Sequence, residues 1–281
     1  MIGSTRYVSQ AEINRQSRIS SDITKLQASV SSGKRLSAAS DDPVAAARIA
    51  SINQTQANNT VYEANINTGA SIASAADTQL ASIQNALTRA KELVLNGRTD
   101  SSSGNDRNAL ATELAGIAGD ITTASQANDP NGNPLFPTGT PSAIPISDSL
   151  QVTATPSYSS VFQGVSTAAG SKTIGDILSA AQTALTNGDN TGLSTSLDEL
   201  DAAIAHVSTA QTDQGLREAR FTSVKSQLQD NDTDLATERT GLEDTDLTYA
   251  LSEIESKQTS LQAAQTVFAQ SMKNNLFSLL A

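Results

Sequence analysis

A seven-residue repeat in the second half of the chain constrains the fold more than any other feature. The residues at this interval are Leu200, Val207, Gln214, Phe221, Leu228, Leu235 and Leu242. A strict repeat of this length requires a long helix that lies along partner helices. We therefore predict a mainly α protein, built as an elongated antiparallel bundle or coiled coil of long helices.

Shorter apolar patterns predict the partner helices. One helix is expected over about residues 43–95, one over residues 110–121 and one over residues 173–185, each with apolar residues three and four positions apart. The composition agrees, because aromatic residues make up only 3% of the chain and Trp is absent. Deep ligand pockets are usually lined by aromatic and large apolar side chains, so thin helical packing is favoured.

The helical pattern is interrupted over residues 128–172. Six of the seven prolines lie between Pro130 and Pro156, beside short alternating stretches such as SLQVTAT. Proline at this density excludes long helices, and the alternation indicates short strands and turns. We predict a small irregular β insertion between two helical halves.

Both ends of the chain carry amphipathic helical patterns. The N-terminal stripe is defined as Ile19, Ile23, Leu26 and Val30, and the C-terminal stripe as Leu247, Leu251, Ile254, Leu261, Phe268, Met272 and Leu279. Terminal helices fray unless something holds them, and a contact between only two helices leaves much of each stripe in water. The pattern predicts that the stripes are buried between subunits when many copies associate.

A hinge is expected between the first terminal helix and the body of the subunit. Gly33 can end one helix in the left-handed conformation. Asp42 can cap the next helix and Pro43 can occupy its first position. Lys34 and Arg35 are expected to favour a helix C-terminus, where cations interact well with the helix dipole.

Two chemical alternatives for the same stretch are weaker. A phosphate-binding loop would need a glycine where Ala28 stands and a Ser or Thr where Arg35 stands. The pair Asp41 and Asp42 could bind a hard cation, but helix capping before proline needs no additional partner. We predict no nucleotide and no metal here.

The remaining candidate residues also favour structural roles. Asp129 begins a Pro-Asn-Gly stretch that is typical of a turn, and Asp244 and Asp246 are expected where a helix restarts. His206, the only histidine, is expected at a solvated helix position. With one histidine and no cysteine, neither a zinc site nor a catalytic triad has its parts. We predict no catalytic residue, no cofactor and no metal ligand.

Charge and hydropathy exclude other classes of function. The net charge is −11, which disfavours nucleic acid as a partner. No apolar run approaches the length of about 18 residues that spans a bilayer. The first residues lack the apolar centre of a cleavable signal peptide, so we expect either a cytoplasmic protein or export by a route that reads no such signal.

Two segments resemble signatures of the bacterial flagellin family. They are SSGKRLSAASDDPVAAARIA at residues 31–50 and LEDTDLTYALSEIESKQTSLQAAQTVFAQSMKNNLFSLLA at residues 242–281. The resemblance implies that terminal helices at residues 1–40 and 244–281 form an inner-core coiled coil. It also implies a long-helix rod at residues 41–127 and 173–243, and that the insertion at residues 128–172 faces outward.

The resemblance implies a non-enzymatic structural subunit that self-assembles in the axis of the flagellum and serves motility. Asp42-Pro43, residues 131–136, the heptad helix and residues 257–264 resemble the hook–filament junction type, whereas residues 275–281 resemble filament-forming flagellin, which stays open as the alternative. A secreted coiled-coil adaptor or effector and a surface hydrolase with an acid pair in the insertion are more remote alternatives.

The partners and the location follow from the same resemblance. The expected partners are copies of the chain in a helical tube, neighbouring hook-associated proteins and flagellin, and an export chaperone that covers the C-terminal helix. The expected location is the extracellular flagellum, reached through the flagellar export apparatus without a cleaved signal peptide.

Overall fold

Helices dominate the computed structural model, which describes residues 2–99 and 103–280, with side chains described for residues 10–99 and 103–273. The described helices are α1 (Ile2–Ser32), α2 (Pro43–Gly97), α3 (Gly104–Ser125), α4 (Tyr158–Phe162), α5 (Ile174–Asn187), α6 (Asn190–Glu243) and α7 (Leu247–Leu280). The described strands are β1 (Ala143–Pro145), β2 (Gln151–Thr153), β3 (Val165–Thr167) and β4 (Gly170–Lys172). The prediction of a mainly α fold with long helices and a small β insertion is confirmed.

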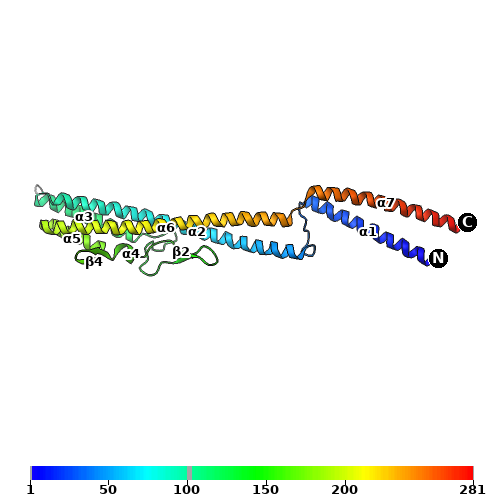
Figure 1. Ribbon diagram of the computed structural model, residues 1–281. Helices are drawn as coiled ribbons and strands as arrows, with labels where there is room; N and C mark the ends of the chain where they lie inside the picture. Colours follow the sequence, from blue (N-terminus) through cyan, green and yellow to red (C-terminus); the bar gives the residue numbers. More distant parts are fainter. Residues whose placement is uncertain (1, 100–102, 281) are drawn as a thin grey trace. The chain divides into compact units, whose positions relative to one another are not determined.

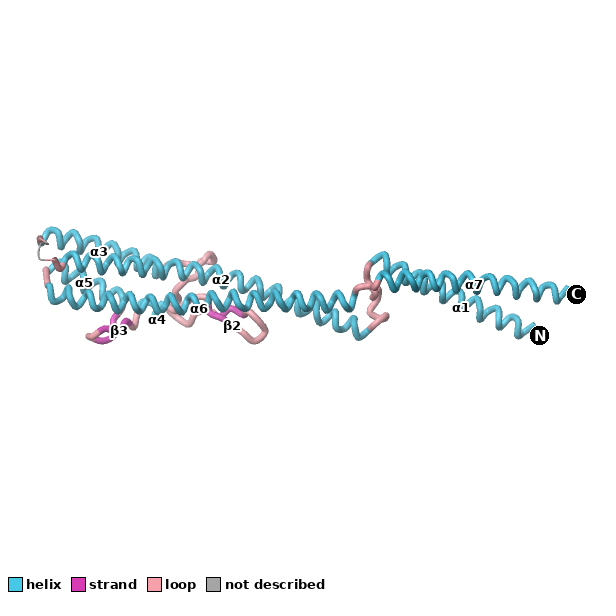
Figure 2. The backbone as a smooth tube through the Cα atoms, turned by 45° about the horizontal axis from the view of Figure 1, so that its top comes forward, coloured by secondary structure: helices cyan, strands magenta, loops and turns pink. Residues whose placement is uncertain are grey.

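The chain divides into two compact units. Unit 1 comprises residues 1–56 and 232–281, and unit 2 comprises residues 57–231. Because α2 and α6 each pass from one unit to the other, each unit contains parts of both helices. Figure 1 shows α2, α3, α5 and α6 side by side in unit 2, and Figure 2 shows the same helices with the strands attached to them.

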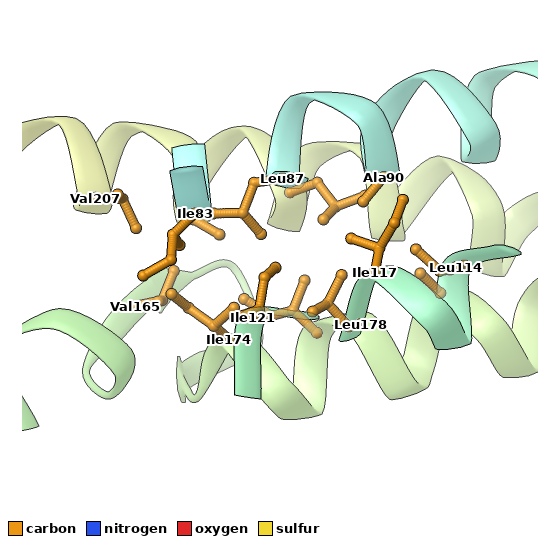
Figure 3. Close-up of a cluster of buried hydrophobic side chains, with 14 of the residues drawn as sticks. Ile83, Leu87, Ala90, Leu114, Ile117, Ile121, Val165, Ile174, Leu178 and Val207 are labelled. Atoms are coloured by element: carbon orange, nitrogen blue, oxygen red, sulfur yellow. The ribbon is translucent and has the colours of Figure 1, made fainter. Parts of the chain in front are cut away.

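Unit 2 is held together by an apolar core between α2, α3, α5 and α6. Figure 3 shows Ile83 and Leu87 of α2 facing Ile121 of α3 and Ile174 of α5, with Val207 of α6 beside them. These five side chains all belong to one continuous buried cluster. Their burial explains why the three- and four-residue spacings predicted these helices correctly.

The residues of the heptad repeat on α6 are buried in the first part of the helix and become more exposed further along it. Leu200, Val207, Gln214 and Phe221 are fully buried, whereas Leu228 is half-buried. The helix runs antiparallel to α2 in unit 2, as shown by the hydrogen bonds from Lys225 to Asn67 at 2.8 Å and from Asn59 to Asn231 at 3.1 Å. The prediction of a long helix beside a partner helix is therefore confirmed.

Gln214 is the polar member of the repeat and connects three elements. Its side-chain amide donates to the carbonyl of Ala73 on α2 at 3.0 Å and to that of Ala154, next to β2, at 2.9 Å. A buried polar group is costly unless it is hydrogen-bonded. Gln214 thus links α6 both to α2 and to the insertion.

The insertion packs onto α2 and α6 through its first hairpin. Strands β1 and β2 pair antiparallel, with Ile144 opposite Val152, and β3 pairs antiparallel with β4. Val152 and Ile146 join Phe221 in a second buried cluster. Gly69 of α2 leaves room for Phe221 of α6 and Ile144 of β1, because a Cβ atom there would lie 2.7 Å from the Phe221 ring and 3.1 Å from Ile144.

Three details of the insertion and the rod confirm or correct the expectations. Residues 158–162 form the short helix α4, which the turn-rich pattern did not predict. Asp129 forms a turn, as expected, because its Oδ1 accepts hydrogen bonds from the backbone amides of Asn131 and Asn133, both at 2.8 Å.

The expectation of a solvated His206 is wrong, since the side chain is half-buried and its Nε2 atom is buried. The burial of this atom could not be read from the position of His206 beside the repeat.

Candidate assembly site at the terminal helices

The two terminal helices, α1 and α7, contact each other along unit 1 and run antiparallel (Figure 1). Within this pair, Ile23 of the N-terminal stripe and Ile254 of the C-terminal stripe are buried, at 8% and 9% exposure. Ala250, which neither stripe includes, is 2% exposed. The remaining stripe residues that the pair partly covers are Ile19, Leu26, Val30, Leu261 and Phe268, all half-buried.

The pair leaves other members of the C-terminal stripe in water. Leu247 is 50% exposed, Leu251 is 54% exposed and Met272 is 38% exposed. Leu279 lies on α7 among the residues whose side chains are outside the described part. The apolar side of α7 is therefore wider than the face that α1 covers.

Apolar residues outside both stripes are also exposed, and on α7 they lie on the flank opposite to Leu247 and Leu251. Ile13 of α1 and Tyr249 and Val267 of α7 are 48%, 67% and 65% exposed. The sequence reasoning missed them because it followed a single line of spacings along each helix. A helical projection of α7 would have found them, since residues 249 and 267 lie on the same flank, about 100° from the line through residues 250, 254, 261 and 268.

An ion pair connects the two terminal helices. Lys257 Nζ of α7 lies 3.1 Å from Asp22 Oδ2 of α1 and 3.6 Å from Glu253 Oε1, one turn away on its own helix. The hydrogen bond to Asp22 and the two negative charges raise the pKa of Lys257 above its ordinary value of 10.5. The sequence reasoning missed this pair, because the partners are 235 residues apart.

The predicted hinge residues lie between α1 and α2. Gly33 follows α1 with φ of +71°, in the left-handed region. Asp42 Oδ1 accepts a hydrogen bond from the Ala45 amide at 3.0 Å, and Pro43 is the first residue of α2. This hydrogen bond, followed by the charge of Arg35, lowers the pKa of Asp42 below its ordinary value of 3.8.

Arg35 lies at a helix C-terminus, as expected, and that terminus belongs to α6. The guanidinium of Arg35 donates to the Leu242 carbonyl at 3.0 Å, and the Arg35 amide donates to the Glu243 carbonyl at 2.7 Å. Both carbonyls belong to the last turn of α6, so the favourable dipole is that of α6.

The second connection, between α6 and α7, pairs with the first. Lys34 and Asp244 form an antiparallel bridge, and the Thr245 amide donates to the Gly33 carbonyl at 3.0 Å. Lys34 Nζ also lies 3.1 Å from Glu243 Oε2. Asp246, expected at a helix restart, caps α7 by accepting from the Tyr249 amide at 3.0 Å.

The described residues offer little for other kinds of site. They contain no group of three or more His, Cys, Asp or Glu side chains that could hold a metal ion. Across the same residues, no helix has the length and apolar character needed to traverse a bilayer. A cavity of about 600 Å³ beside α3, α4 and α5 has no charged side chain in its lining, so it lacks the acid pair that a hydrolase in the insertion would need.

Comparisons with known proteins agree with these features. The family model of the bacterial flagellin N-terminal helical region matches residues 4–139, and that of the bacterial flagellin C-terminal helical region matches residues 197–280. Flagellar hook-associated protein 3 of Salmonella typhimurium is 31% identical over 112 residues, which are 40% of this chain and 35% of that protein. The match thus spans about a third of the length of that relative.

Solved structures share the fold. A flagellar hook-associated protein from Vibrio parahaemolyticus has a TM-score of 0.65 at 19% identity, over 73% of this chain and 100% of that chain. The flagellar junction protein FlgL from Legionella pneumophila has a TM-score of 0.57 at 14% identity, over 70% and 100%. Because the two family models together cover most of the sequence, this chain belongs to the bacterial flagellin family.

Proposed function

We propose that the protein is a structural, non-enzymatic subunit of the flagellar axis, of the type that joins hook and filament. Membership of the flagellin family supports the structural role. The junction type is supported by the names of the relatives, which are a flagellar hook-associated protein 3 and a flagellar junction protein. In this role, the chain contributes to motility by connecting neighbouring parts of the flagellum.

The observation that carries this proposal is the uncovered apolar surface of the terminal pair. Leu247 and Leu251 are half exposed although they lie on a helix that already contacts α1. Burying a leucine side chain completely is worth about 1.5–3 kcal/mol. Packing of α1 and α7 against the same helices of neighbouring copies would bury these residues, which is the arrangement expected in the inner core of a tube.

The proposal assigns a role to each part of the chain. Residues 1–40 and 244–281 form the inner-core coiled coil, residues 41–127 and 173–243 form the rod, and residues 128–172 face outward. The partners are copies of this chain, neighbouring hook-associated proteins and flagellin. Because α7 exposes apolar residues before assembly, we also propose export through the flagellar apparatus with a chaperone that covers this helix, to an extracellular location.

Filament-forming flagellin is the second candidate function. It is favoured by the family models, which are those of flagellin itself. The two candidates differ in what the purified protein forms. A filament flagellin polymerises alone into long filaments, whereas a junction protein stays monomeric until it meets the end of a hook.

Electron microscopy of the purified protein, with and without isolated hooks, tests both candidates. We expect binding at hook ends and no long filaments from the protein alone. Leu251→Ser should reduce hook binding, because it places a hydroxyl where a neighbouring copy would pack. Leu216→Ser, on a leucine of α6 in unit 2 that is 65% exposed, is the matched control and should leave binding at the wild-type level.

Three outcomes would contradict the proposal. Long filaments from the protein alone would identify a filament flagellin. Absence of binding to hooks and filaments would remove the axial role. Equal binding by wild type and Leu251→Ser would show that the surface of the terminal helices is not the assembly site.

A further inference from the structure

The cavity of about 600 Å³ in unit 2 lies where α3, the insertion and the start of α5 meet. Its inner wall is apolar, because Ile121, Ile174 and Leu178 belong to the buried cluster of Figure 3. Small-molecule sites typically have volumes of about 300–1,000 Å³. All the lining residues belong to unit 2, so the cavity is complete within one compact unit of the chain.

Three aromatic side chains gather in this cavity. The chain has five Phe residues, four Tyr residues and no Trp, and Phe136, Tyr158 and Phe162 are all in the lining. Tyr158 stacks on Phe162 with ring centroids 4.8 Å apart, and Phe136 meets Phe162 edge to face at 5.4 Å. Phe136 and Phe162 are buried, whereas Tyr158 is half-buried. The buried rings therefore form a fixed base for the ring of Tyr158.

The short helix α4 holds these rings in place. Ser157 caps it by accepting from the Ser160 amide at 3.3 Å, and the Tyr158 amide donates to the Pro137 carbonyl at 2.9 Å. Residues 158–162 lie between the segments that the two family models match, which are residues 4–139 and 197–280. This wall of the cavity is thus outside the segments that identify the family, and the structural role proposed above does not use it.

Neutral polar groups surround the aromatic base. Gln126 and Asn128 contribute side-chain amides and Tyr158 contributes a hydroxyl, and none of these three groups has a hydrogen-bond partner among the described residues. Amide and phenol groups can both donate and accept. The lining contains no charged side chain, although charged residues make up 17% of the chain. The cavity is therefore suited to a neutral ligand that has an apolar face and several hydroxyl groups.

We propose that the cavity binds a short neutral oligosaccharide. The C–H groups on one side of a sugar ring carry a small positive partial charge, which suits the negative face of an aromatic ring. The hydroxyl groups of the sugar can pair with the amides of Gln126 and Asn128 and with the Tyr158 hydroxyl. A charged ligand would find no opposite charge in the lining, and a purely apolar ligand would take the two amides out of water without a partner.

The absence of Trp allows a direct measurement of binding. Tyr158→Trp keeps an aromatic ring at the proposed stacking position and places a single fluorescent indole in the cavity. Cellotriose, maltotriose and triacetylchitotriose are the neutral probes, glucose is the one-ring probe, and trigalacturonic acid is the anionic control. We expect a saturable change in emission with at least one neutral trisaccharide at a Kd of about 1 mM or below. Glucose should bind more weakly, and the anionic control should cause no change.

Calorimetry with the trisaccharide that binds locates the site. Gln126→Ala and Tyr158→Ala should each weaken binding about fivefold or more, because each removes a group that contacts the sugar. Tyr158→Phe keeps the ring and should weaken binding less than Tyr158→Ala does. Gln163→Ala is the matched control for Gln126→Ala, since both glutamines are exposed and Gln163 follows α4 outside the lining. It should bind as wild type does.

Four results would overturn the inference. If none of the neutral trisaccharides binds at millimolar concentrations, the cavity is not a carbohydrate site. Equal affinity for glucose would contradict an oligosaccharide. Equal binding by wild type, Gln126→Ala and Tyr158→Ala would place the sugar elsewhere on the chain. A response of Tyr158→Trp to a proline-rich peptide, with none to sugars, would assign the cavity to a protein partner.

The inference does not depend on the proposed function. Sugar binding is measured on the isolated chain, whereas the axial role is measured by binding to hooks. Leu251→Ser should leave sugar binding unchanged, because Leu251 lies on α7 in unit 1. Failure of either proposal is therefore visible without reference to the other.

Discussion

Glu218 on α6 is a carboxylate whose ionisation opposes folding. The side chain is half-buried, and its Oε1 atom is buried and accepts no hydrogen bond from the described residues. Burial, and then the charge of Asp77, raise the pKa of Glu218 above its ordinary value of 4.5. The folded state therefore holds the carboxyl proton of Glu218 more tightly than the unfolded state does. As a result, the free energy of unfolding decreases as pH rises from the ordinary pKa of 4.5 through the raised pKa of the folded state.

The residue-scale prediction is that Glu218→Gln raises the urea midpoint at pH 7. At pH values well below 4.5 the wild-type side chain is also neutral, so the gain should shrink toward zero. Asp213→Asn, on an exposed position of α6, is the control and should change the midpoint little. An equal gain at both pH values would show that ionisation is not the cause.

At the scale of elements, the contact between α1 and α7 combines a narrow apolar contact with one ion pair. Ile23, Ala250 and Ile254 are the residues that this contact buries among the described side chains of α1 and α7. Beside it, Lys257 Nζ lies 3.1 Å from Asp22 Oδ2, and the side chains of Asp22 and Lys257 are 49% and 28% exposed. Because both partners reach solvent, the pair is expected to set alignment more than to supply stability.

The element-scale prediction is a small favourable coupling between Asp22 and Lys257. It is obtained from a double-mutant cycle with Asp22→Asn and Lys257→Gln, using exchange protection of amides in residues 19–26 as the measure of stability. The coupling should fall in about 1 M salt, where the Debye length is short. A coupling near zero, or a coupling that is the same at low and high salt, would exclude an electrostatic link between the helices.

At the scale of the whole molecule, the two units differ in how much apolar surface they bury. Unit 2 contains a continuous cluster that includes Leu80, Leu114 and Leu200, each at 0% exposure. In unit 1, the buried apolar residues among the described side chains are Ile23, Ala45, Ile52, Ala250 and Ile254. Local stability follows the density of buried apolar contacts, so unit 1 is the weaker unit in the isolated chain.

The molecule-scale prediction is unfolding in two steps. In hydrogen exchange with increasing denaturant, amides of α1 and α7 should lose protection before those of residues 76–94 and 193–210 in unit 2. In protein bound to hooks, α1 and α7 should gain protection, because neighbouring helices would cover Leu247 and Leu251. Coincident loss of protection throughout the isolated chain would contradict this prediction.

The features that depend on local physics could be predicted from the amino-acid sequence. The heptad and the shorter spacings predicted the helices, because each apolar period corresponds to one face of a helix. The ends at Gly33 and Pro43 were also predictable, since they follow from backbone conformations that these residue types favour. The same local signals could not predict α4, whose burial of Val161 and Phe162 depends on the surrounding helices.

The folded structure determines which segments far apart in the chain meet. Arg35 caps α6, which ends 208 residues later at Glu243, and Gln214 donates to carbonyls on α2 and beside β2. It also decided that α1 covers Ala250 and leaves Leu251 exposed, although leucine is the more apolar residue. Spacing shows that a helix has an apolar side, whereas the position of its neighbour decides which part of that side is buried.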